Sequence, residues 1–242
     1  MFSEYVAPEI EKLFSSQLKP LTIREISCFG ITESNTSQAL QGFEANFPGI
    51  NLGFRFHFPI IQVRLYARQN SGDNLGHELQ EAVSWVAQKL GDKVFSLQGR
   101  SLAQETLHLL QSRTKNLVVL EACTGGLLAH LITSAEQEGA QALMLAKVNR
   151  AERQSPGIKH TDTAEQAKTW AREIRANTGV DYALSTVQDQ EASSRAWVGL
   201  ADKARTLTQE VILAYPDRQA NLTVAAFSAL NLLRLELLGR LD

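Results

Sequence analysis

The sequence predicts a two-domain protein of the α/β (α+β) class, and three observations carry this prediction. Strand-like and helix-like segments alternate along nearly all of the 242 residues, which favours helices layered on sheets. The chain is longer than the ~150 residues of a typical domain. The segment Gln98-Gly99-Arg100-Ser101 interrupts the alternation, and Ser101 with Gln104 resembles a capping box that begins the next helix. We therefore predict a small α+β domain over residues 1–98 and an α/β layered domain over residues 99–242.

The first domain is expected to place its helices on one face of a small sheet. Ile61, Val63, Leu65 and Ala67 alternate with polar residues, which predicts a strand with one buried and one solvated face. The expected elements are a helix over Val6–Phe14, a strand over Leu21–Cys28, a helix with Ser34 as its N-cap that runs to about Ala45, strands over Asn51–His57 and Pro59–Ala67, a helix over Leu75–Leu90 and a short strand at Val94-Phe95.

The second domain alternates more regularly. Its expected elements are helices over Leu102–Ser112, Gly125–Ala135 and Thr163–Thr178, a long closing helix that starts at Asp217, and strands over Leu117–Leu120, Leu143–Val148, Tyr182–Val187, Ala196–Ala201 and Leu207–Ala214. A polar stretch over residues 149–162 connects the second of these strands to the next helix.

Composition excludes several classes of function. A net charge of −2 is too near neutral to indicate a nucleic-acid or membrane partner, and no apolar run approaches the ~20 residues of a membrane span. The start of the chain lacks the pattern of a secretory signal. Cys28 and Cys123 form no zinc or disulfide pattern, which fits a reducing cytoplasm. The five histidines lack metal-ligand spacing, so we expect neither a metal nor a cofactor.

One segment has a pattern that can carry chemistry. Glu121-Ala122-Cys123-Thr124-Gly125-Gly126 connects an apolar strand to an apolar helix. Unpaired N–H groups at a helix N-terminus attract anions, and glycines let a ligand approach the backbone. This favours Thr124, Gly125 and Gly126 as ligand-binding residues. A tight turn without a ligand is the other interpretation, and the pattern alone leaves both open.

The same segment is similar to the Glu-Ser-Cys-Thr-Gly-Gly motif of the CinA family, the competence/damage-inducible proteins. The resemblance extends over nearly the whole chain. The other matching segments are Phe29-Gly30-Ile31-Thr32-Glu33-Ser34, Pro48-Gly49-Ile50, Leu52-Gly53-Phe54, Asp181-Tyr182-Ala183-Leu184, Trp197-Val198-Gly199-Leu200 and Pro216-Asp217-Arg218.

This resemblance implies a KH-like middle domain over residues 1–98 and a nicotinamide mononucleotide deamidase-like domain over residues 99–242. In the family the second domain hydrolyses the nicotinamide amide to the acid and ammonia, with a serine nucleophile and a nearby lysine and tyrosine. The resemblance also implies a homodimer and a nicotinamide nucleotide or other phosphate ligand. We expect the family's N-terminal pyrophosphatase-like domain to be missing from this sequence. The first domain has no Gly-x-x-Gly loop, so nucleic-acid binding is not expected.

The chain departs from the family pattern at each position that carries the chemistry. Ala122 stands in place of the serine, and Asn149 and Gln154 fall near the positions of the tyrosine and the lysine. The family's glycine-rich loop is replaced by residues 186–191, whose two carboxylates would repel a phosphate. Leu222 occupies the position of an arginine that the family carries in the closing helix.

Three functions therefore remain, and one of them is a different small-molecule-binding function in the same pocket. We expect a catalytically degenerate CinA-like protein that acts as a structural, oligomerisation or nucleotide-binding module, because loss of a nucleophile alone costs orders of magnitude in rate. The alternative is an active deamidase with rearranged residues, in which Lys147 or Lys159 replaces the lysine. Cys123 is expected to be a small buried side chain, Thr124 to cap the following helix, and Glu121 either to orient the turn or to pair locally.

Overall fold

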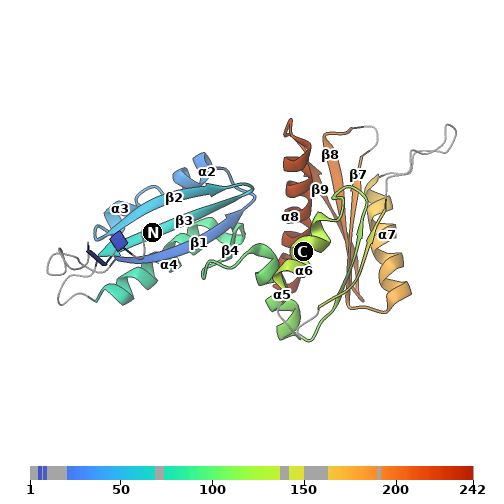
Figure 1. Ribbon diagram of the computed structural model, residues 1–242, viewed down its shortest axis with the longest axis horizontal. Coiled ribbons are helices and arrows are strands. Elements are labelled where there is room, and N and C mark those ends of the chain that lie inside the picture. Colours follow the sequence, from blue (N-terminus) through green and yellow to red (C-terminus); the bar gives the residue numbers. More distant parts are fainter. Residues whose placement is uncertain are drawn as a thin grey trace. The chain divides into compact units, whose positions relative to one another are not determined.

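The computed structural model describes residues 5–6, 8–9, 21–68, 74–136, 142–149, 163–189 and 192–241. The chain forms two compact units, Met1–His57 with Ile61–Gly99, and Phe58–Ile60 with Arg100–Asp242. Both units mix helices and strands (Figure 1), so the predicted α/β class is confirmed. The helix predicted over Val6–Phe14 lies mostly outside the described residues.

The first unit contains one four-stranded sheet in the order β2-β3-β1-β4. Its main elements are β1 (Leu21–Phe29), α2 (Glu33–Ala39), α3 (Phe43–Asn46), β2 (Ile50–His57), β3 (Ile60–Arg68), α4 (Leu75–Leu90) and β4 (Val94–Ser96). Counting α2 and α3 as one helical segment, this succession is the split βαβ pattern. The connection from α2 to α3, Leu40-Gln41-Gly42, lacks the Gly-x-x-Gly sequence with which KH domains hold a nucleic-acid backbone.

One apolar core holds this unit together. Strand β3 alternates as the sequence predicts, with Ile61, Val63, Leu65 and Ala67 buried and the intervening residues half-buried. Several of these side chains pack with Leu79, Val83 and Val86 of α4. The apolar stripe of α4 therefore covers the buried face of the sheet.

The helix predicted from Ser34 to about Ala45 is instead two helices. Thr32 is the N-cap of α2, and its side chain accepts a hydrogen bond from the Asn35 backbone N–H at 3.2 Å. Gly42 then takes a left-handed conformation with φ of 85°, which an α-helix cannot continue through, and α3 starts after it. A single helical period through both segments concealed this break.

The second unit contains a five-stranded sheet in the order β6-β5-β7-β8-β9. Its elements are α5 (Leu102–Ser112), β5 (Leu117–Glu121), α6 (Leu127–Ala135), β6 (Leu143–Val148), α7 (Thr163–Thr178), β7 (Tyr182–Gln188), β8 (Arg195–Ala201), β9 (Thr206–Ile212) and α8 (Arg218–Leu237). Strand β5 is parallel to β6 and β7, whereas β8 pairs antiparallel with both β7 and β9.

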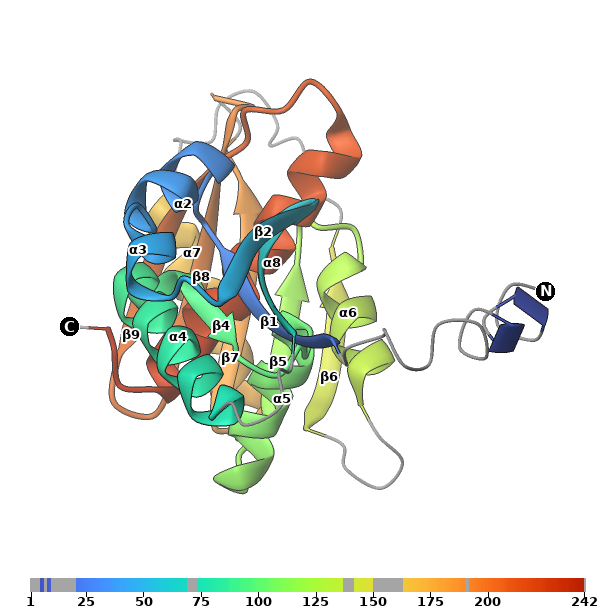
Figure 2. The same cartoon turned by 90° about the vertical axis from the view of Figure 1, so that its left-hand side faces the viewer.

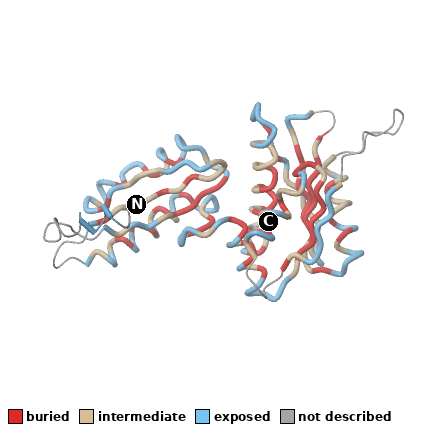
Figure 3. The backbone as a smooth tube through the Cα atoms, in the orientation of Figure 1, coloured by how far each residue is buried: buried red, intermediate tan, exposed pale blue. Residues whose placement is uncertain are grey.

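Helices cover both faces of this sheet. Helix α7 lies on one face, and α5, α6 and α8 lie on the other (Figure 1). Figure 2 shows α6 beside β5 and β6, the two strands that it connects. The most continuous burial follows the central strands (Figure 3), and every residue of β5 is buried. Apolar residues on both sides of β5 are expected for a strand with helices above and below.

The helix caps follow the sequence predictions in two places. Ser101 and Gln104 form a reciprocal capping box at the start of α5, with N–H to oxygen distances of 3.2 and 2.9 Å. Asp217 caps α8 by accepting a hydrogen bond from the Ala220 backbone N–H at 2.9 Å. Both caps satisfy N–H groups that the helices cannot satisfy internally.

Candidate functional site

The candidate site lies at the carboxyl ends of β5, β6 and β7 in the second unit. The chain runs from β5 through α6 on one face to β6, and then through α7 on the opposite face to β7, which pairs with the other side of β5. The strand order therefore changes direction at β5. Ligands of open α/β sheets bind at such a switch point, outside the carboxyl ends of the strands.

Glu121, the last residue of β5, organises this corner. Its side chain is fully buried, and its carboxylate accepts four hydrogen bonds. Oε2 accepts from the Thr124 hydroxyl at 2.6 Å and from the N–H groups of Gly126 at 3.0 Å and Leu128 at 3.1 Å. Oε1 accepts from the Ala129 N–H at 2.9 Å. The carboxylate thus caps the N-terminus of α6, where negative charge is favoured.

The two glycines make this capping possible. Gly125 and Gly126 have φ values of 63° and 92°, in the left-handed region that side chains with a Cβ rarely adopt. They fold the chain back so that α6 starts above the end of β5.

The predicted cap of α6 by Thr124 is wrong. The Thr124 hydroxyl donates to Glu121, and the N-cap residue, Gly126, has no side chain. Both interpretations of Glu121 apply, because its carboxylate pairs with nearby groups and thereby orients the turn.

Ala122 lies where the family motif carries its serine. Its backbone N–H donates to the carbonyl oxygen of Thr186 at 2.9 Å, which fixes the turn against β7. The side chain is a half-buried methyl group. The position faces the carboxyl edge of the sheet as a nucleophile would require, but it has no atom that could attack a carbonyl carbon.

Asn149 follows β6 and lies beside this turn. Its backbone N–H donates to the carbonyl oxygen of Glu121 at 2.7 Å. The parallel pairing of β5 and β6 therefore brings into the corner the residue that corresponds most nearly to the family's tyrosine. Lys147, two residues earlier, is exposed and lies opposite Leu120 in the register. Gln154 and Lys159 lie outside the described residues.

The remaining hydroxyl and thiol groups of the corner are buried. The Thr124 and Thr186 hydroxyl oxygens lie 3.0 Å apart, and both side chains are inaccessible to solvent. Burial raises the pKa of the Cys123 thiol to about 11, and a hydrogen bond with Thr186 opposes this only partly. The thiol is thus protonated at neutral pH, as expected for a small buried side chain. Thr186 was not among the residues predicted to form this corner. The feature that could have identified it is a hydroxyl near the carboxyl end of a buried parallel strand.

Residues 186–191, which replace the family's glycine-rich loop, start in the last three residues of β7, and Asp189 follows the strand. The Gln188 side-chain amide donates to the Ser193 carbonyl at 2.9 Å. Asp189 is buried, pairs with Arg195 at 3.0 Å and accepts from the Ala192 N–H at 3.1 Å. The Asp189 carboxylate is therefore neutralised locally. Gln190 and Glu191 lie outside the described residues.

Other predicted features can be placed more briefly. Leu222 is half-buried in the second turn of α8, behind the Asp217 cap. No cluster of three histidine, cysteine, aspartate or glutamate side chains suited to a metal ion occurs among the described residues. Within the same residues, no helix combines the length and apolar character that crossing a membrane requires.

Known proteins resemble the chain along its whole length. A scan against protein-family models found no match. A CinA-like protein of Desulfosudis oleivorans is 29% identical over 255 aligned residues, covering 98% of this chain and 62% of the relative. One of Desulforapulum autotrophicum is 28% identical, covering 98% and 61%. The chain thus spans about three fifths of the length of these curated relatives.

A solved structure agrees with the fold. A competence-damaged protein (CinA) superfamily protein from Klebsiella pneumoniae superimposes with a TM-score of 0.50 at 18% identity, covering 57% of this chain and 96% of that one. At this identity the match supports the fold alone. The relatives and the Glu121–Gly126 turn lead to one conclusion: over nearly its whole length, the chain is similar to proteins of the CinA family.

Proposed function

We propose that this chain is a catalytically silent CinA-like protein, which keeps the nicotinamide-nucleotide amidase fold and acts as a structural and self-association module. The observation that carries the proposal is Ala122, at the turn where the family motif has its serine. Acyl transfer from an amide needs a nucleophile and a base that removes its proton. A methyl group supplies neither.

No neighbouring group within the described part of the corner is suited to replace the serine. The Thr124 hydroxyl is buried and donates its proton to Glu121 at 2.6 Å. The Cys123 thiol is buried and has a raised pKa of about 11, which leaves almost no thiolate at neutral pH. Lys147 is exposed on β6 and lies opposite Leu120 in the register, not opposite Ala122.

The arrangement of Glu121 argues against a phosphate in this corner. A phosphate at the start of α6 would need the N–H groups of Gly126, Leu128 and Ala129, and these already donate to the Glu121 carboxylate. It would also approach a buried negative charge, which is unfavourable in a medium of low dielectric constant. Among the non-catalytic roles, a structural role is therefore better supported than nucleotide binding through Thr124, Gly125 and Gly126.

Strand β6 supports the self-association part of the proposal. It is an edge strand, and β5 is its neighbour in the sheet. Met144, Leu145 and Val148 are 61%, 46% and 54% exposed, and Lys147 is the strand's one charged residue. Exposed apolar edge strands pair readily with another chain. We propose that β6 of a second copy pairs with this edge and forms the homodimer.

Ammonia release from nicotinamide mononucleotide tests the catalytic part. We expect no release above background from the purified chain, and none from Ala122→Ser, because Asn149 and Gln154 stand near the positions of the family's tyrosine and lysine. Turnover by the unmodified chain would overturn the proposal and favour the rival function, a deamidase with rearranged residues. Cys123→Ala and Lys147→Ala would then show which group acts. Calorimetric titration with the same nucleotide distinguishes a nucleotide-binding module from a purely structural one, because only the former gives heat of binding without turnover.

The dimer is tested by sedimentation or light scattering as a function of concentration. We expect Leu145→Glu to shift the protein toward the monomer. Ile212 is a matched control, since it is 57% exposed on β9, the opposite edge of the same sheet. Ile212→Glu should leave the mass unchanged. A monomeric unmodified chain, or equal effects of both substitutions, would contradict the proposed interface.

A further inference from the structure

Strand β1 of the first unit is paired along only part of one side. It has nine residues, whereas its neighbour β4 has three. The register joins Ser27 to Ser96 and Cys28 to Val94. Strand β3 is the neighbour of β1 on its other side. Among the described residues, no strand residue pairs with Leu21–Glu25 on the β4 side. Such an edge presents backbone N–H and C=O groups that can pair with another strand.

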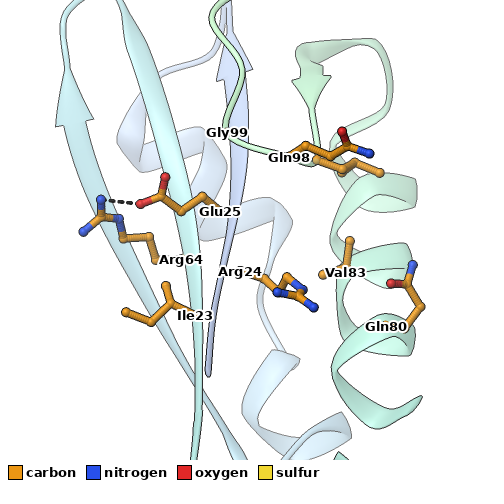
Figure 4. A pocket seen from close by; sticks show the side chains of 9 residues that line it. Ile23, Arg24, Glu25, Arg64, Gln80, Val83, Gln98 and Gly99 are labelled. Carbon is orange, nitrogen blue, oxygen red and sulfur yellow. Dashed lines mark ion pairs between the residues drawn. The ribbon is translucent and has the colours of Figure 1, made fainter. Parts of the chain in front are cut away.

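A cavity of about 800 Å³ adjoins this edge. Its lining comes from both sides of β1, as Figure 4 shows: Arg24 points toward Gln80 and Val83 of α4, whereas Glu25 points toward Arg64 of β3. Leu97, Gln98 and Gly99, which follow β4, complete the lining. A cavity lined from both faces of a sheet lies around the strand edge, where a further strand would lie.

The side chains around this edge favour an acidic partner. Arg24 is exposed, and Arg64 forms an ion pair with Glu25, so two guanidinium groups face one carboxylate. The Nε atom of Arg64 is buried and lacks a hydrogen-bond partner among the described residues. Ile23 and Leu97 add apolar surface, with 42% and 43% of their area exposed. The cavity therefore combines excess positive charge with two exposed apolar side chains.

We propose that this edge binds an extended acidic peptide segment of a partner protein, which adds to β1 as a further strand. Backbone pairing with Leu21–Glu25 would supply affinity that is independent of side chains. Successive side chains of the added strand point to opposite faces of the sheet. One face would meet Arg24 beside α4, and the other would meet Ile23 and Arg64. This inference concerns the first unit and does not depend on the proposed loss of catalysis.

Three labelled synthetic peptides test the proposal by fluorescence anisotropy with the full chain. They have the sequence Thr-Glu-Val-Glu-Val-Thr and its counterparts with lysine or glutamine in place of glutamate. We expect the acidic peptide to bind at least about tenfold more tightly than the lysine peptide, a preference that weakens with added salt. Arg24→Glu should abolish or reverse the preference for the acidic peptide. Arg55 is exposed on β2 and does not line the cavity, so Arg55→Glu is the matched control and should retain the preference.

Amide hydrogen exchange identifies where the peptide binds. The acidic peptide should slow exchange at Leu21–Glu25, because their edge N–H groups become paired. Binding without this protection, or displacement of the peptide by citrate at constant ionic strength, would show an anion site rather than an added strand and would overturn the proposal. Failure of all three peptides to bind, or equal binding of all three, would overturn it as well.

Discussion

At the residue scale, Glu121 has the most consequential side chain of the corner. It is fully buried, and the groups that surround its carboxylate are a hydroxyl and three backbone N–H groups. Hydrogen bonds to a charged acceptor contribute more than neutral ones, and a buried donor that loses its acceptor is costly. The negative charge thus holds the β5–α6 turn together.

We expect Glu121→Gln to lower the free energy of unfolding by about 3 kcal/mol, since one carboxylate oxygen becomes an NH2 group that faces N–H donors. Urea unfolding followed by circular dichroism measures the change. Glu173→Gln, an exposed carboxylate on α7, is the control and should change stability by less than about 0.5 kcal/mol. Equal effects of the two substitutions would contradict the capping role.

The chemical content of the corner was predictable from the sequence, whereas its hydrogen bonding was not. The identity of Ala122 can be read directly, and the parallel strands bring Asn149 next to it. The cap was misassigned to Thr124, because a carboxylate can reach residues five to eight positions ahead only when two glycines reverse the chain. Local spacing does not encode this reach.

At the element scale, the contact between α7 and β8 depends on a missing side chain. A Cβ built on Gly199 would collide with the Ala167 backbone carbonyl and the Ser185 hydroxyl. The Ser185 hydroxyl donates to that same carbonyl oxygen at 2.6 Å. The helix therefore lies directly against the sheet at this point.

Gly199→Ala should destabilise the second unit by about 1–3 kcal/mol, because a tightly packed interior must move to admit the methyl group. Thermal unfolding measures the loss. Gly76 provides the control: a Cβ there meets nothing within 4 Å, and the residue lies in the first turn of α4. Gly76→Ala should be neutral or slightly stabilising. A neutral Gly199→Ala would show that α7 can shift away without cost.

Lys115 and Asp181 join the segments that enter β5 and β7. Lys115 Nζ lies 2.7 Å from Asp181 Oδ1, and the Asn116 N–H donates to Oδ2 at 3.1 Å. The hydrogen bond from Lys115 is the largest influence that lowers the pKa of the Asp181 carboxyl and raises that of the ammonium group. A lowered carboxyl pKa stabilises the fold above the unfolded value of about 3.9, and this stabilisation disappears as the pH falls through the folded value.

We therefore expect Asp181→Asn to reduce stability at pH 7 and to have progressively less effect as the pH falls from about 5 toward the lowered pKa. Urea unfolding at a series of pH values gives the difference between the two proteins. Between pH 5 and 9 the difference should be constant, since both groups keep their charges there. A difference that grows on acidification would exclude this ion pair as its source.

The elements themselves were largely predictable, since periodicity placed every described strand and most of the described α-helices within a few residues. The main exception is the α2–α3 pair, where Gly42 interrupts an otherwise continuous helical pattern. The exposure of β6 was not predictable either. Its apolar sequence matches that of a buried parallel strand, and only the sheet order shows that it lies at an edge.

At the scale of the whole molecule, the chain consists of two compact units with separate cores. The three tryptophans divide between them: Trp85 is in the first unit, and Trp170 and Trp197 are in the second. Trp85 packs against Phe43 and Phe47, at centroid distances of 5.8 and 6.2 Å, and thus reports on the first core.

We expect the two units to unfold at different urea concentrations. Trp85→Phe leaves the fluorescence of the second unit, and the double variant Trp170→Phe with Trp197→Phe leaves that of the first. Distinct fluorescence midpoints of the two variants, with both transitions present in the far-UV circular dichroism of each, are the expected result. Coincident midpoints would mean that the chain unfolds as one cooperative body.

The capping of α6 by Glu121 has a further consequence for attempts to restore activity. The start of a helix carries about half a unit of positive charge, which can stabilise an oxyanion that develops during acyl transfer. Here a full negative charge of the protein already lies against it. A tetrahedral intermediate formed at residue 122 would therefore gain little from this dipole. A designed hydrolase on this scaffold would need its oxyanion donors from the β6 or β7 side of the corner.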